Sequence, residues 1–205
     1  VSILEQEICE QPPVVRRLLE RETENAARLA ALVRGQFDYA VIAARGTSDN
    51  AARYAQYLWG AHNRLPVALA TPSLFTLYQR PPRLAGALVV GISQSGQSPD
   101  IVAVGAEGRR QGRPTLVITN DPDSPLAAAA KAVIPLHAGP EQAVAATKTY
   151  TASLAALALF SCQLADDAAR LAQLRQMPDR IEQTLGSLAP ILPRVERYRY
   201  MDRCA

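Results

Sequence analysis

Between residues 39 and 136, short apolar runs alternate with stretches of helical spacing, and this alternation limits the folds open to the chain. Each run is unbroken, as in strands covered on both faces, and we expect strands at Tyr39–Ala44, Val67–Ala70, Ala87–Ile92, Thr115–Thr119 and Ala132–Leu136. The stretches between them predict helices at Asn50–Asn63, Ser73–Gln79, Pro99–Gln111 and Ser124–Lys131. Such alternation forms parallel sheets through right-handed crossovers. We therefore expect an α/β fold with a five-stranded parallel sheet flanked by helices, and we assume the flavodoxin-like strand order 2-1-3-4-5.

Helical patterns continue on both sides of this region. Before it, apolar residues recur at helical spacing until Gly35, with an interruption at Pro12 and Pro13. After it, we expect a long helix rich in Ala and Leu at Val144–Leu164 and amphipathic helices at Asp166–Leu185 and Ser187–Arg197. The chain thus divides into a helical extension (residues 1–34), an α/β domain (residues 35–165) and a helical connector (residues 166–205).

Two strand-to-helix loops are rich in hydroxyl side chains. The first follows the first strand and contains Gly46, Thr47 and Ser48; the second follows the third strand and contains Ser93, Gln94, Ser95, Gly96 and Ser98. Glycine lets the backbone approach a ligand, and the following helix offers unpaired N–H groups and the positive end of its dipole. Ordinary helix capping accounts for one such loop, but the second holds more hydroxyls than one cap can use. Because ligands of open α/β sheets bind where the strand order reverses, after strands one and three, the pair of loops predicts a phosphate site.

A third loop, residues 137–144, leads into the long helix and turns at Gly139-Pro140. Glu141 is a weak candidate for a catalytic base, because burial can raise the pKa of a carboxyl group toward neutrality. Its alternative role is to cap the helix with its carboxylate. Lys148 lies either on a solvated helix face or at the rim of the site. No other catalytic residue is evident in the sequence.

The sequence lacks the motifs of several common nucleotide and metal sites. The sequence has no GxGxxG after a strand and no GxxxxGK[ST], so a nucleotide is not the expected ligand. His62 and His137 are the only histidines, and Cys9, Cys162 and Cys204 have no CxxC spacing, so we expect neither a metal site nor a cofactor. The simplest interpretation is that both histidines have structural roles and that the cysteines are reduced thiols.

Charge and hydropathy limit the classes of partner and the cellular location that we expect. The formal net charge is +3 and the basic residues form no run, so we do not expect nucleic acid as a partner. No stretch reaches the ~18 apolar residues of a membrane span, and the first residues include charges where a signal peptide would be apolar. We expect a cytoplasmic protein. The apolar helix after Val144 makes a symmetric homodimer the expected assembly.

At the three loops the sequence resembles the SIS (sugar isomerase) family, and within it the isomerase half of glucosamine-fructose-6-phosphate aminotransferase and related amino-sugar-phosphate isomerases and deaminases. The resemblance covers about residues 35–165 and rests on Arg45-Gly46-Thr47-Ser48, on Ile92 to Ser98, and on Ala138-Gly139-Pro140-Glu141 with Val144 to Lys148. It implies that the sugar phosphate is held by Thr47, Ser48, Ser93, Gln94, Ser95 and Ser98, with the backbone of Val144 near the sugar. Many members have Glu-Thr in place of Gln97-Ser98 and Ser in place of Ala146, so the identity of the sugar stays open.

The resemblance also implies an activity. Family enzymes isomerise aldose and ketose phosphates through an enediol, and some release ammonia from an amino sugar, without a metal or redox cofactor. Their base and histidine lie in a second SIS domain, so we expect the base outside this segment, and residues 198–205 resemble the start of such a domain. The alternatives are a catalytically silent binding domain or the sugar-phosphate sensor of a transcription regulator. Residues 1–34 do not favour the regulator, because they lack the tri-helical pattern and basic face of a helix-turn-helix.

Overall fold

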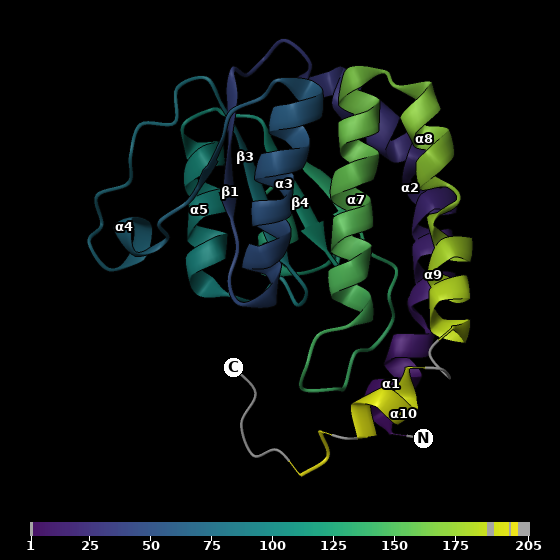
Figure 1. Cartoon of the computed structure of the whole chain (residues 1–205). Helices are drawn as coiled ribbons and strands as arrows, with labels where there is room; N and C mark the ends of the chain where they lie inside the picture. The colour runs from purple at the N-terminus through teal and green to yellow at the C-terminus, as the bar shows by residue number, and fades with distance from the viewer. Residues whose placement is uncertain (1, 188–190, 197, 201–205) are drawn as a thin grey trace.

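The computed structural model describes residues 2–187, 191–196 and 198–200. Its centre is one parallel sheet in the order β2-β1-β3-β4-β5, which confirms the expected fold class and strand order (Figure 1). The strands are β1 (Tyr39–Ala43), β2 (Val67–Leu69), β3 (Ala87–Ser93), β4 (Thr115–Thr119) and β5 (Ala132–Pro135). Every residue of β3 and β4 is buried, as the unbroken apolar runs predict for strands covered on both faces.

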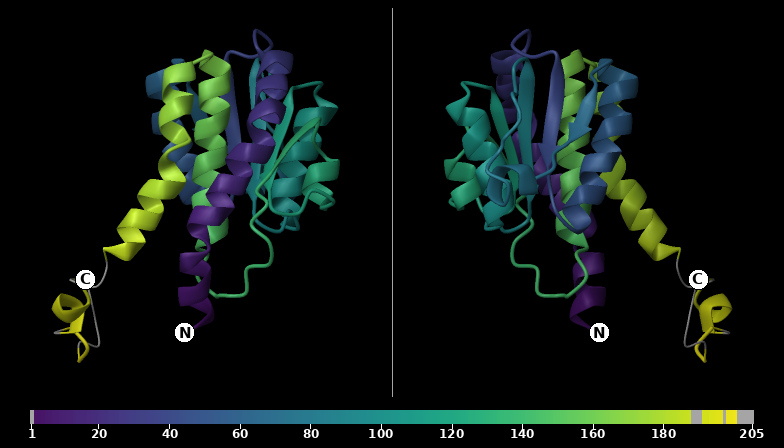
Figure 2. Two further views of the ribbon diagram at one scale, coloured as in Figure 1. Left: turned by 90° about the vertical axis from the view of Figure 1, so that its right-hand side faces the viewer. Right: turned by 90° about the vertical axis from the view of Figure 1, so that its left-hand side faces the viewer.

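Helices cover both faces of the sheet. In the described residues these are α1 (Ile3–Cys9), α2 (Gln11–Val33), α3 (Thr47–Asn63), α4 (Ser73–Thr76), α5 (Pro99–Arg110), α6 (Pro125–Ala128), α7 (Lys148–Ala165), α8 (Ala168–Leu174), α9 (Met177–Gly186) and α10 (Leu192–Glu196). Alternate residues of each strand point to opposite faces: Ile42 packs with α2, α3 and α7, whereas Val41 packs with α5 and α6. Figure 2 shows these two helix layers on either side of the sheet.

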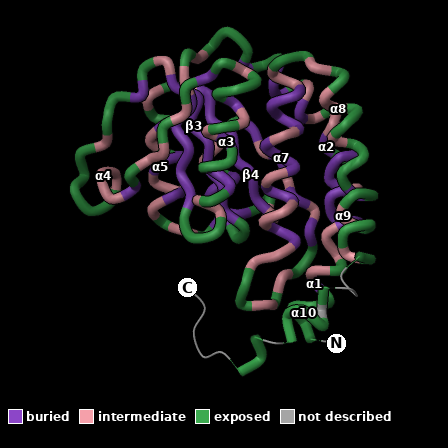
Figure 3. The backbone as a smooth tube through the Cα atoms, viewed as in Figure 1, coloured by how far each residue is buried: buried purple, intermediate pink, exposed green. Residues whose placement is uncertain are grey.

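The N-terminal helices are part of the same core. Pro12 and Pro13 lie in the first turn of α2, where a backbone N–H would have no partner within the helix, so the prolines are tolerated there. Because proline does not continue a preceding helix, α1 and α2 are separate helices. Leu18 and Leu29 of α2 are buried in the cluster that also contains α7 and the sheet. The helical extension therefore folds onto the α/β domain. Figure 3 shows burial concentrated in the strands and in the facing sides of α2, α3 and α7.

Helix α7 is fixed to α3 by a buried aromatic pair. The rings of Trp59 and Phe160 lie 5.8 Å apart between centroids, and Trp59 donates its indole N–H to the carbonyl of Leu157 at 3.2 Å. Both side chains are at most 1% exposed. Burial of such a side chain stabilises the fold by roughly 1.5–3 kcal/mol. This contact fixes α7 against α3.

Several predicted bounds were wrong, for local reasons. Helix α4 ends at Thr76 rather than Gln79, because Gln79 adopts φ +49°. Helix α6 ends at Ala128 rather than Lys131, and α7 begins at Lys148 rather than Val144. The expected helix at 166–185 is two helices, α8 and α9. Of the predicted connector, residues 188–190, 197 and 201–205, including most of the segment resembling a further domain, lie outside the described residues.

Candidate functional site

The first hydroxyl loop ends in a glycine that starts α3. Gly46 has φ +55° and serves as the N-cap, so the chain turns sharply between Ala43 at the end of β1 and Thr47 at the start of the helix. Thr47 is exposed and Ser48 half-buried. Neither hydroxyl makes a hydrogen bond to another described residue. Both hydroxyls are therefore free to donate to a ligand at the start of the helix.

The second hydroxyl loop is a tight turn built on Ser93, the last residue of β3. Ser93 is 8% exposed and its Oγ accepts the N–H of Gly96 at 3.1 Å, while Ser95 Oγ accepts the N–H of Gln97 at 3.3 Å. Ser98 is the N-cap of α5, but its hydroxyl does not bond to the helix. The hydroxyl hydrogens of the first two serines stay available, because each oxygen only accepts in these contacts.

An ion pair joins the two hydroxyl loops. Strands β1 and β3 are neighbours, with Ala43 opposite Gly91, so the loops that follow them leave the same edge of the sheet. Arg45 of the first loop contacts the carboxylate of Asp100, in the first turn of α5, at 2.5 Å. The structure thus brings the predicted phosphate residues of both loops together. Asp100 also offsets the charge of Arg45, and the other predicted donors of the two loops are neutral hydroxyl, amide and backbone N–H groups.

Asn120 connects the second loop to the third, and the sequence analysis missed it. Its backbone N–H donates to the carbonyl of Gln94 at 3.1 Å. Its side chain accepts the N–H of Ala138 at 2.9 Å and donates to the carbonyl of Gly139 at 2.7 Å. The available signal was its position: Asn120 follows β4 directly, at the edge of the sheet where the hydroxyl loops also begin.

In the third loop, the carboxylate of Glu141 faces the start of α7. It accepts the N–H of Thr147 at 3.0 Å and that of Thr149 at 3.1 Å, and the hydroxyl of Thr149 also donates to it. These are the contacts of a helix cap. Val144, expected near a sugar, is fully exposed in the loop before the helix. The structure does not place its side chain against the two hydroxyl loops.

Of the two positions considered for Lys148, the solvated helix face is wrong. Lys148 is 3% exposed, and its Nζ lies 2.5 Å from Oε2 of Glu10 at the junction of α1 and α2. The hydrogen bond from Lys148 is the main cause that lowers the pKa of Glu10 below its ordinary value. A buried ammonium requires such a partner, because an unpaired charge away from water is costly.

The histidines and cysteines that the structure describes, His62, His137, Cys9 and Cys162, form no metal site. His62 is exposed, whereas Nε2 of His137 lies 2.7 Å from Oε1 of Glu22. No group of three or more His, Cys, Asp or Glu side chains in the described part of the chain could hold a metal ion. Over the same residues, no helix is long and apolar enough to span a bilayer.

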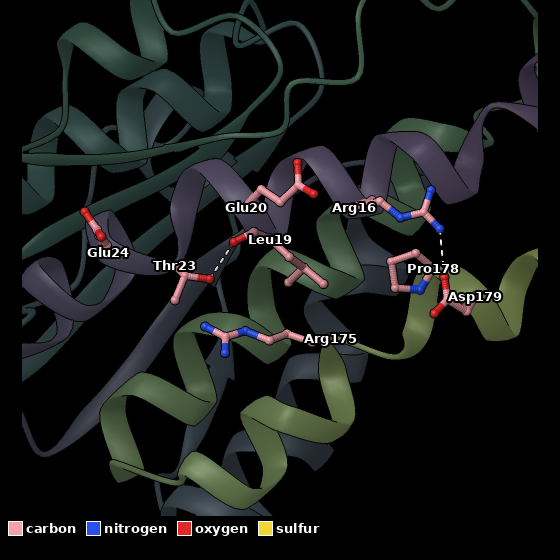
Figure 4. A pocket seen from close by; sticks show the side chains of 8 residues that line it. All are labelled: Arg16, Leu19, Glu20, Thr23, Glu24, Arg175, Pro178 and Asp179. Carbon is pink, nitrogen blue, oxygen red and sulfur yellow. Dashed lines mark hydrogen bonds and ion pairs between the residues drawn. The ribbon is translucent and has the colours of Figure 1, made fainter.

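A cavity of about 490 Å³ lies between α2 and α9, away from these loops (Figure 4). Its walls include Arg16, Glu20 and Arg175, and Arg16 is paired with Asp179 at 2.8 Å. The cavity shares no residue with the hydroxyl loops. Because charged side chains of both signs line it, it does not present the neutral donors that the sequence predicts for a phosphate.

The family model of the SIS domain matches residues 38–161, which is more than half of the chain. This chain belongs to the SIS domain family. The match begins just before β1 and ends within α7, so it contains all three loops of the candidate site. The family expected from the loop motifs is therefore confirmed.

This SIS domain has curated relatives in bacteria. It is 35% identical to glutamine–fructose-6-phosphate aminotransferase (isomerizing) of Zymomonas mobilis, over 83% of this chain and 29% of that enzyme. It is 33% identical to the enzyme of the same name from Thermus thermophilus, over 94% of this chain and 34% of the enzyme. The chain thus spans about a third of the length of these relatives.

Two solved structures that share the fold are 38% and 26% identical to this chain. A protein from Silicibacter pomeroyi DSS-3, assigned as a phosphosugar isomerase, superposes with a TM-score of 0.85 at 38% identity and covers 88% of this chain and 56% of that chain. The C-terminal domain of glucosamine-fructose-6-phosphate aminotransferase from Francisella tularensis gives a TM-score of 0.71 at 26% identity, over 88% of this chain and 53% of the other. Both comparisons place this SIS domain among folds found in phosphosugar proteins.

Proposed function

We propose that this SIS domain binds the phosphate group of a phosphorylated hexose or amino sugar between the two hydroxyl loops. The observation that carries the proposal is the pairing of two helix starts, α3 and α5, whose loops are tied together by Arg45 and Asp100. Helix starts favour anions through their unpaired N–H groups and dipoles. The names of the relatives, which include a fructose 6-phosphate aminotransferase and a phosphosugar isomerase, support a sugar phosphate as the ligand.

Each residue has a proposed role. The phosphate-binding residues are Gly46, Thr47, Ser48, Ser93, Gln94, Ser95 and Ser98. The two glycine turns let the backbone come close to the anion, and the hydroxyls donate to its oxygens. Val144 is proposed to meet the sugar through its backbone, since its side chain is exposed and its loop is linked to Gln94 by way of Asn120.

We further propose that the domain belongs to an enzyme that isomerises or deaminates phosphosugars. The curated relatives support this activity, and no metal or cofactor is required for proton transfer through an enediol. Glu141 is a poor base in this arrangement, because its carboxylate already accepts hydrogen bonds from Thr147 and Thr149. The base would then come from a group other than Glu141. The homodimer remains a prediction, for sedimentation to test.

Calorimetry with fructose 6-phosphate tests the binding site. Ser95→Ala should weaken binding about 10-fold to 100-fold, because a hydrogen bond to a charged group contributes ~1.5–3 kcal/mol. Ser187→Ala is the matched control, since Ser187 is an exposed serine after α9, away from the hydroxyl loops. Unchanged affinity of the Ser95 variant in a folded protein would remove the second loop from the site.

A further inference from the structure

Helix α1 lies beyond the sheet, beside the loop that connects β5 to α7 (Figure 1). Glu7 of this helix is only 4% exposed. Its carboxylate accepts the N–H of Gln142 at 2.5 Å and that of Ala143 at 3.2 Å. A carboxylate buried without hydrogen bonds would be strongly unfavourable. The backbone of the third loop therefore supplies the partners that let Glu7 stay buried.

Polar anchors hold the third loop at three places. Asn120 bonds to Ala138 and Gly139 where the loop begins, and Glu7 holds its middle. Glu10, at the junction of α1 and α2, pairs with Lys148 where the loop ends. Ala138 packs in the hydrophobic core, but between α1 and the rest of the loop a cavity of about 230 Å³ remains, with Glu7, Glu10 and Lys148 among its walls. The loop position thus depends on hydrogen bonds and an ion pair.

We propose that Glu7 is a positioning residue for the sugar-binding side of the site, an inference that rests on the proposed phosphosugar function. Val144 follows Ala143 directly, so the amides that Glu7 holds fix the backbone next to the position proposed to meet the sugar. The phosphate loops have their own link through Arg45 and Asp100, which does not involve Glu7. Loss of the Glu7 carboxylate should therefore affect recognition of the sugar and leave recognition of the phosphate intact.

The test measures two ligands on the full 205-residue chain by calorimetry: fructose 6-phosphate and inorganic phosphate. Glu7→Ala should weaken fructose 6-phosphate binding about 5-fold to 10-fold, because it removes about one hydrogen bond's contribution to ordering the loop. The dissociation constant of inorganic phosphate should stay unchanged. Glu7→Gln should lose less, because its amide keeps one acceptor oxygen. Glu5→Gln is the matched control, since Glu5 is exposed on the same helix and its carboxylate has no partner among the described residues.

Hydrogen exchange gives a second readout that needs no ligand. The amides of Gln142 and Ala143 should exchange faster in Glu7→Ala, while those of β3 stay protected; if the alanine variant does not fold, Glu7→Gln is measured instead. Equal weakening for both ligands, or unchanged affinity for fructose 6-phosphate, would overturn the positioning role and leave the phosphate site standing. If the unmodified chain binds neither ligand, the proposed function fails, and the inference fails with it.

Discussion

Gly96 occupies a point of the second loop where no side chain fits. Its φ is +63°, and a β-carbon there would lie 2.1 Å from the Oγ of Ser124, which is 1% exposed and caps α6. Gly96→Ala should therefore destabilise the fold through both a left-handed backbone, roughly 1–2 kcal/mol, and a clash of about 1–3 kcal/mol. Gly112→Ala is the control, because Gly112 has φ +72° with open space around it. Urea unfolding that finds equal losses for the two variants would contradict the clash.

Residues differ in how well the sequence alone predicts their position in the fold. The placement of Thr47 and Ser95 in loops after buried strands was predictable, because hydroxyls beside a glycine after an apolar run form a local pattern. Their contact with a phosphate stays a prediction. Glu7 was not, since its partner Gln142 is 135 positions away and nothing near Glu7 in the sequence marks it as buried. The burial of Lys148 was not predictable for the same reason: its partner, Glu10, is brought close by the packing of α2 against α7.

At the scale of elements, strand positions followed from the sequence more closely than helix ends did. Buried parallel strands are unbroken apolar runs, and β4 matches its predicted bounds. The start of α7 was wrong because Val144 to Ala146 are compatible with a helix, whereas Glu141 caps the chain at Thr147 and Thr149. Helix ends depend on such capping contacts, which helical periodicity does not contain.

The link between α1 and α7 should weaken in acid. The hydrogen bond from Lys148 lowers the pKa of Glu10 below 4.5 in the folded protein, so the pair stabilises the fold fully above that value and loses its effect as the pH falls through the lowered pKa. Below it, protonated Glu10 would leave the buried Lys148 without its ionic partner. The difference in unfolding free energy between the parent chain and Glu10→Gln should thus be present at neutral pH and shrink in acid.

Urea unfolding at neutral pH and at steps below 4.5 measures this difference. Glu5→Gln, in α1, serves as the control and should change the unfolding free energy little at any of these pH values, because its carboxylate has no partner in the described part of the chain. A difference for Glu10→Gln that stays constant across the titration would show that the ion pair does not hold α1 to α7.

At the scale of the whole molecule, the parallel sheet gathers the three loops at one edge. The chain returns to this edge after β1, β3, β4 and β5, so residues far apart in sequence, such as Thr47 and Asn120, become neighbours of one site. The alternating pattern predicts a parallel sheet whose strands all end at this edge, whereas the strand order that makes β1 and β3 neighbours was assumed. The packing of the helical extension was not predicted, because an amphipathic helix such as α2 shows an apolar face without showing which surface it covers.

The phosphate group should contribute more to the affinity of the whole site than the sugar does. Two helices, α3 and α5, point their N-termini at the same edge of the sheet, and Arg45 is occupied by Asp100, so the donors offered to a ligand are neutral hydroxyl and N–H groups that suit an anion. Two or more hydrogen bonds to a charged phosphate, at ~1.5 kcal/mol or more each, amount to at least about 100-fold in affinity. Glucosamine 6-phosphate should therefore bind at least that much more tightly than glucosamine in parallel calorimetric titrations.

Ser95→Ala should reduce the ratio of the two affinities, because it removes a donor to the phosphate alone, whereas the Ser187→Ala control should leave this ratio unchanged. Equal affinities for the two sugars would mean that these loops do not form the phosphate site.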